Sequence, residues 1–137
     1  MRRIMTSTAL VFAGALLLSG CSAGGSTPTP SADPCEELRV AVRDIANGAQ
    51  NALAGTDPAE VQEKLEGYSE RIDEFSAKAQ DNSVASDVAA SLDEAVTAAM
   101  EFVATLPPDG EVDPDAAAER QAAIQEAATP MIEACAE

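Results

Sequence analysis

Three Asp-Pro pairs mark the places where helices can begin in this chain. They are Asp33-Pro34, Asp57-Pro58 and Asp113-Pro114. An Asp side chain accepts hydrogen bonds from the free amides of a first helical turn, and proline suits the first helical position because it has no amide to satisfy there. Asn82-Ser83 is a further capping pair, and a helix that begins there must end before Pro107-Pro108. The chain is therefore expected to form helices near residues 34–53, 58–80, 84–106 and 114–135.

Each of these segments carries apolar residues at the three- and four-residue spacing of one helix face. The expected faces are Cys35, Leu38, Val42, Ile45, Ala49 and Ala52 in the first segment; Val61, Leu65, Tyr68, Ile72, Phe75 and Ala79 in the second; Val88, Leu92, Ala95, Ala99, Val103 and Leu106 in the third, backed by Val84, Val96, Met100 and Phe102; and Ala117, Gln121, Ile124, Ala128, Met131 and Cys135 in the fourth. β-Branched residues never cluster, so a sheet is not expected. The pattern predicts an all-α protein, a small antiparallel four-helix bundle; the alternative is a looser array of three helices with a detached tail.

A proline lies inside the fourth segment. Pro130 removes one backbone donor and crowds the preceding turn, so the helix should kink or restart there, with Thr129 as a new N-cap. A tolerated kink on an exposed side is the alternative.

The first 21 residues follow a different pattern from the rest. Arg2 and Arg3 precede a mostly apolar run from Ile4, which ends in the tetrad Leu18-Ser19-Gly20-Cys21. The run is shorter than the roughly 20 apolar residues that a transmembrane helix needs. This arrangement resembles the signal peptide and lipobox of bacterial lipoprotein precursors. The resemblance implies cleavage after Gly20 and lipid attachment to Cys21; the alternatives are an uncleaved anchor and a plain secretory signal.

Together with the composition and the helical periodicity of the rest, the resemblance leads us to expect three parts: a signal peptide (1–20), the lipidated Cys21 with its tether (21–32) and a helical domain (33–137). Residues 22–32 contain only Ser, Ala, Gly, Thr and Pro, which is the composition of a flexible linker. The expected location is the extracytoplasmic face of the cell membrane, with the lipid as the membrane anchor.

Two cysteines remain once Cys21 carries lipid. Cys35 opens the first helix and Cys135 closes the fourth, and in an up-down-up-down bundle these ends lie at the same pole. Outside the cytoplasm such a pair persists as a disulfide. We therefore predict a Cys35–Cys135 bond that staples the bundle. A catalytic or metal-binding pair has less support because the chain has no histidine and no C-x-x-C motif.

The charge of the chain bears on its partners. Its 24 acidic and 8 basic residues give a net charge of −16, which becomes −18 once Arg2 and Arg3 leave with the signal peptide. This charge repels phosphate backbones and anionic headgroups, so no nucleic-acid partner is expected. Arg39 and Arg43, one turn apart, are weak candidates to hold an anionic ligand; pairing with Glu36, Glu37 or acids of a neighbouring helix is the more economical interpretation.

No pattern of catalytic residues, metal ligands or cofactor contacts is recognised in the sequence. Carboxylates alternate from Asp109 to Asp115 as at the start of an EF-hand loop, but Pro114 takes the place of the required glycine and Arg120 that of the bidentate glutamate. The favoured function is a monomeric, non-enzymatic lipoprotein that binds another envelope or extracellular protein. The alternatives are a protective lipoprotein acting against a phage, a toxin or an envelope enzyme, and a carrier of an apolar ligand or lipid.

Overall fold

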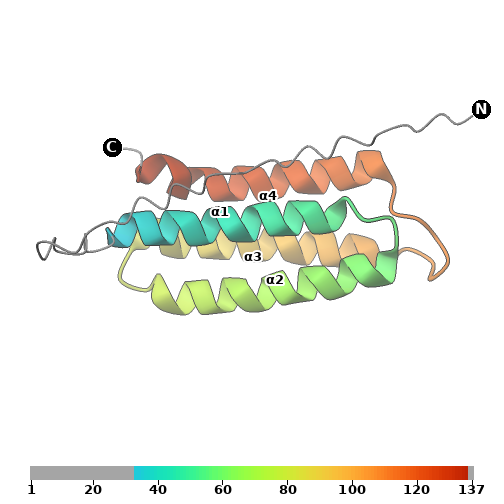
Figure 1. The fold of residues 1–137 in the computed structure, drawn as a ribbon, viewed down its shortest axis with the longest axis horizontal. Helices are drawn as coiled ribbons and strands as arrows, with labels where there is room; N and C mark the ends of the chain where they lie inside the picture. The colour runs from blue at the N-terminus through green and yellow to red at the C-terminus, as the bar shows by residue number, and fades with distance from the viewer. Residues whose placement is uncertain (1–32, 136–137) are drawn as a thin grey trace, which may run out of the picture.

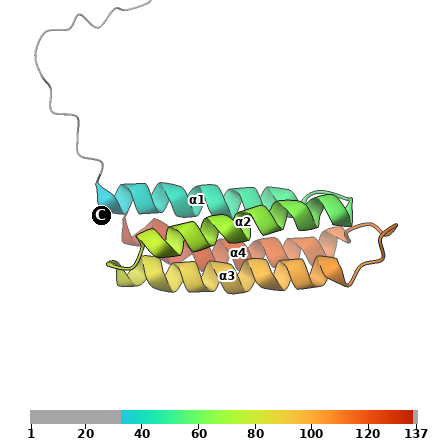
Figure 2. The same ribbon diagram turned by 90° about the horizontal axis from the view of Figure 1, so that it is seen from below.

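The computed structural model describes residues 33–135, so the predicted signal peptide, Cys21 and the tether lie outside the described residues. The described chain forms helices α1 (Pro34–Leu53), α2 (Pro58–Lys78), α3 (Ser83–Ala104) and α4 (Pro114–Ala134). The helices run antiparallel in chain order and lie side by side (Figures 1 and 2). The predicted all-α four-helix bundle is confirmed, and the detached tail of the rival arrangement is not observed because α4 packs against both α1 and α3.

The four predicted caps hold the helix starts. Asp33 accepts from the Cys35 amide at 3.0 Å, and Asn82 accepts from the Ala85 amide at 3.0 Å. Asp57 and Asp113 each accept from two first-turn amides at 2.9–3.2 Å. Local hydrogen bonding therefore determines where each helix begins, as the sequence predicts.

The helices form a ring in which α1 contacts α2 and α4, and α3 contacts α2 and α4, with only slight contact between α1 and α3 across the centre. Among the neighbouring pairs, α1 and α2 pack least closely. The small alanine side chains of the core let neighbouring helices approach closely. This close packing is least complete between α1 and α2.

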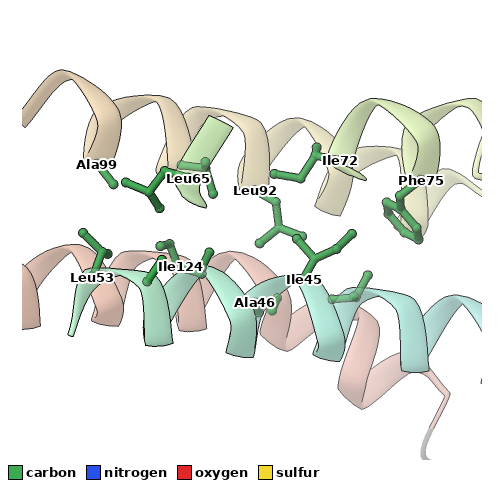
Figure 3. Packing of buried hydrophobic residues seen from close by; sticks show 14 of the residues in the cluster. Ile45, Ala46, Leu53, Leu65, Ile72, Phe75, Leu92, Ala99 and Ile124 are labelled. Carbon is green, nitrogen blue, oxygen red and sulfur yellow. The ribbon is translucent and has the colours of Figure 1, made fainter. Parts of the chain in front are cut away.

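The core is apolar, and no polar or charged side chain is buried within residues 33–135. Figure 3 shows Leu65, Leu92 and Ile124 projecting into the space between the helices, and all three are fully buried. The predicted faces are mostly confirmed, with one clear error. Val84, expected to back the third face, is 37% exposed because the core side of α3 is centred on Val88 and Leu92 and Val84 lies beside it.

Pro130 does not end the fourth helix. α4 continues through it to Ala134, and the Thr129 hydroxyl donates to the Gln125 carbonyl at 2.9 Å. The predicted restart with Thr129 as N-cap is therefore wrong. Pro130 is exposed, so its ring is accommodated on the solvent side of the helix, which is the alternative that the sequence left open.

The disulfide between Cys35 and Cys135 is present, with the two Cα atoms 5.7 Å apart. It joins the first turn of α1 to the end of α4 at one pole of the bundle, which we call the disulfide pole. The connection between α2 and α3 lies at the same pole, and the other two connections lie at the opposite, distal pole (Figure 1). The bond thus closes the ring of helices between its first and last members.

Candidate functional site

The described residues present surface features rather than an enclosed active site. Within residues 33–135, no three His, Cys, Asp or Glu side chains are grouped so that they could hold a metal ion. None of the four helices is long and apolar enough to cross a membrane. Candidate sites must therefore be sought among the charged surfaces and the hollows between helices.

The two predicted ligand residues behave differently. Arg39 donates to Glu36 on its own helix at 2.6 Å, and this hydrogen bond lowers the pKa of Glu36 below its usual value and raises that of Arg39. Arg43 is exposed and makes no ion pair with the described residues. Neither arginine lines either of the hollows described below. Arg39 thus pairs with a nearby acid of its own helix, which is the alternative to ligand binding that the sequence favours. The structure does not join Arg39 and Arg43 into one site.

A groove of about 340 Å³ lies between α1 and α2 near the disulfide pole. We call it the α1–α2 groove, and its lining residues are Pro34, Glu37, Leu38, Ala41 and Ile45 of α1 with Arg71, Glu74, Phe75 and Lys78 of α2. Ile45 and Phe75 are buried and form its floor, and Figure 3 shows them at the same end of the core. The charged members are exposed and form its rim. Sequence reasoning missed this groove because its residues come from separate segments.

A second hollow of about 420 Å³ lies at the distal pole, where the loop after α1 meets the loop before α4. The Val112 amide donates to the Thr56 carbonyl at 3.2 Å and ties the two loops together. Val112 is 6% exposed and extends the core into this pole. The sequence offered no signal for this role, because Val112 lies in an acidic loop outside any helical periodicity.

Carboxylates without cationic partners cover much of the surface. In the described part of the chain the ion pairs within 4.0 Å are Arg39–Glu36 and Lys64–Glu60. Arg71 and Arg120 lie over the rings of Tyr68 and Phe102, at 5.4 and 5.6 Å from the centroids. Most acidic side chains are thus free to interact with an external cation or a basic protein.

The outer side of α2 carries the longest acidic run. Glu63, Glu66, Glu70 and Asp73 are all exposed, and we call them the α2 acidic face. Spacings of three and four residues place them along one side of the helix, over about 15 Å. Within this face, Glu66 accepts a hydrogen bond from Gln62 at 3.1 Å, and none of the four side chains has an ion pair with a described residue.

No protein-family model, curated protein or solved structure matches this chain significantly. The structure itself defines an antiparallel four-helix bundle closed by a disulfide. Because this architecture serves unrelated functions, the function must be argued from the surface.

Proposed function

We propose that this protein is a lipid-anchored, extracytoplasmic lipoprotein whose helical bundle binds a basic region of another envelope or extracellular protein without catalysing a reaction. The observation that carries the proposal is the α2 acidic face, four exposed carboxylates along one side of a helix with no cation paired to them. Complementary charge of this kind steers a basic partner and selects against acidic ones.

The bundle suits a rigid binding surface. Its helices are capped at their starts, its core holds no buried polar side chain among the described residues, and a disulfide joins its first and last helices. A surface that is already ordered loses little conformational entropy when it binds, which favours affinity.

The proposed anchor is the lipid on Cys21. Two acyl chains hold a protein stably at a membrane, whereas the net charge of −18 that remains once Arg2 and Arg3 leave with the signal peptide would repel anionic headgroups. The eleven residues from 22 to 32 reach about 30 Å when extended at about 3 Å each. This length allows the bundle to meet a partner beyond the lipid headgroups.

The test of binding compares two variants of equal charge in the full-length protein. The first converts the α2 acidic face to amides (Glu63→Gln, Glu66→Gln, Glu70→Gln and Asp73→Asn). The control converts four exposed acids of α3 to amides (Asp87→Asn, Asp93→Asn, Glu94→Gln and Glu101→Gln). Proximity labelling in living cells should detect a neighbour with the wild type and the control and lose it with the first variant. Equal loss in both variants, or no loss in either, would refute a role for the α2 face.

The test of anchoring is separate. Cys21→Ser should abolish the incorporation of labelled palmitate that the wild type shows. Incorporation that persists in the variant, or that is absent from the wild type, would contradict the lipid anchor while leaving the binding proposal to its own test.

A further inference from the structure

The α1–α2 groove combines unpaired charges of both signs with an apolar floor. Glu37 lies on the α1 side of its rim, and Arg71, Glu74 and Lys78 lie on the α2 side. These four side chains are exposed, and no ion pair within 4.0 Å joins any of them to another described residue. The groove therefore holds opposite charges apart around a hollow instead of joining them across it.

The positive charge at this place is unusual for the molecule. Of the other cations in the described chain, Arg39 and Lys64 are paired with acids, and Arg43 and Arg120 line neither hollow. Arg71 lies over the Tyr68 ring, at 5.4 Å from its centroid, and still lines the groove. Arg71 and Lys78 are thus the basic side chains that adjoin an accessible apolar surface. An anionic group bound there would not have to displace an existing ion pair.

The floor gives the groove its apolar character and its depth. Ile45 and Phe75 are 2% and 3% exposed and close the bottom, while Leu38 and Ala41 are half-buried along the α1 wall. A volume of about 340 Å³ falls at the small end of the range of about 300–1,000 Å³ that is common for ligand sites. This small volume above a floor of buried side chains suits one hydrocarbon chain better than a bulky ligand entering the core.

We propose that the α1–α2 groove binds a single-chain zwitterionic amphiphile of the lysophospholipid type. The acyl chain lies on Leu38, Ala41, Ile45 and Phe75. The phosphate lies within reach of Arg71 and Lys78, and the ammonium is near Glu37 and Glu74, so every rim charge meets its opposite. An anionic head alone would be repelled by the two glutamates, and a cationic head alone by Arg71 and Lys78.

The position of the groove agrees with a ligand taken from a membrane. Pro34, the first residue of α1, lines the groove, so the groove lies where the chain arrives from the tether. This argument about the source of the ligand rests on the proposed anchor at Cys21. The binding chemistry itself depends only on described residues and is independent of the α2 acidic face.

The test measures binding to the mature chain, residues 21–137 with Cys21→Ser, which keeps the helical domain and removes acyl chains that would compete for the groove. Four dodecyl probes are titrated below their micelle concentrations: dodecylphosphocholine, dodecyl sulfate, dodecyltrimethylammonium and dodecyl maltoside. Calorimetry should show that dodecylphosphocholine binds at least about tenfold more tightly than each of the other probes. Each of the others lacks one or both head-group charges, and the loss of one charge-assisted hydrogen bond weakens affinity by about this factor. Equal affinity for dodecylphosphocholine and dodecyl maltoside would overturn the proposal.

Variants locate the site. Arg71→Gln with Lys78→Gln should weaken dodecylphosphocholine binding about tenfold or more, whereas Arg43→Gln with Lys64→Gln, which makes the same change in net charge outside the groove, should leave it unchanged. Ala41→Phe should fill the groove and abolish binding while the circular dichroism of the bundle is retained. If Ala41→Phe fails to fold, the two exposed charge variants decide. Equal effects of both charge pairs would overturn the assignment to this groove and would leave the α2 acidic face untouched.

Discussion

Replacing Gly48 by alanine tests a close contact between α1 and α2. An added Cβ at Gly48 would lie 2.2 Å from Cζ and Oη of Tyr68 and 2.3 Å from its Cε1. The Tyr68 ring of α2 thus occupies the place where a side chain of α1 would be. The Tyr68 side chain is half-buried, and the Arg71 guanidinium lies 5.4 Å from the centroid of its ring.

Two effects oppose each other in Gly48→Ala. Alanine in place of glycine within a helix raises the free energy of unfolding by about 1 kcal/mol. Forcing a methyl group into a packed contact costs about 1–3 kcal/mol. Since the predicted contact is far shorter than van der Waals distance, the whole ring must move and lose its packing on α1, and we take this cost as about 2 kcal/mol. The expected net result is a loss of about 1 kcal/mol in the free energy of unfolding.

Gly67→Ala is the matched control, because a Cβ at this exposed position of α2 meets nothing within 4 Å. It should stabilise the protein by about 1 kcal/mol. In a Tyr68→Ala background Gly48→Ala should also stabilise, so the double-mutant cycle should give a coupling of about 2 kcal/mol. Urea unfolding followed by circular dichroism, with the disulfide intact, measures all these variants. If Gly48→Ala stabilises the wild type as much as Gly67→Ala does, the packing of Tyr68 on Gly48 is refuted.

Three further predictions concern the disulfide, a cap and an ion pair. Replacing Cys35 and Cys135 together by Ala should lower the free energy of unfolding by about 4–5 kcal/mol on the chain-entropy model, because the bond spans a sequence separation of 100. Guanidinium unfolding measures this difference, and a loss under about 1 kcal/mol would contradict the prediction. Asp57→Ala should cost about 1 kcal/mol, since Asp57 accepts from two first-turn amides, whereas Asp57→Asn should keep most of the stability; thermal unfolding compares them. The Arg39 hydrogen bond lowers the pKa of Glu36, so the pair stabilises the fold above the usual glutamate pKa and this contribution is lost as the pH falls through the lowered value. NMR titration of Arg39→Gln should show the Glu36 pKa rising towards its usual value, and an unchanged titration midpoint would disprove this cause.

The candidate site was less predictable than the fold. Arg39 and Arg43 stand out in the sequence as neighbouring cations, yet Arg39 is engaged with Glu36 and neither residue lines a hollow. The α1–α2 groove instead has Glu37, Arg71 and Lys78 around one hollow, although the two cations are more than thirty positions away from Glu37 in the chain. Its existence depends on how closely two particular helices pack, and helical periodicity carries no information on that distance.

The core shows the same division between local pattern and packing. Helical spacing correctly predicts that Leu65, Leu92 and Ile124 are buried, because one face of each helix is removed from water where the helices meet. Val84 and Val112 are two residues whose burial the helical spacing did not predict. Val84 lies at the edge of its face and remains 37% exposed, whereas Val112, in a loop, is enclosed by the neighbouring loop at the distal pole.

The sequence by itself determined the helix starts, the apolar faces and the pairing of Cys35 with Cys135. These depend on hydrogen bonds within one turn, on a repeat of 3.6 residues and on the up-down order imposed by short connections. Tertiary structure decided that α1 and α2 stand apart near the disulfide pole and that Tyr68 lies on Gly48. Those outcomes depend on the shapes of side chains that meet from different helices, and no single segment of the chain contains both surfaces.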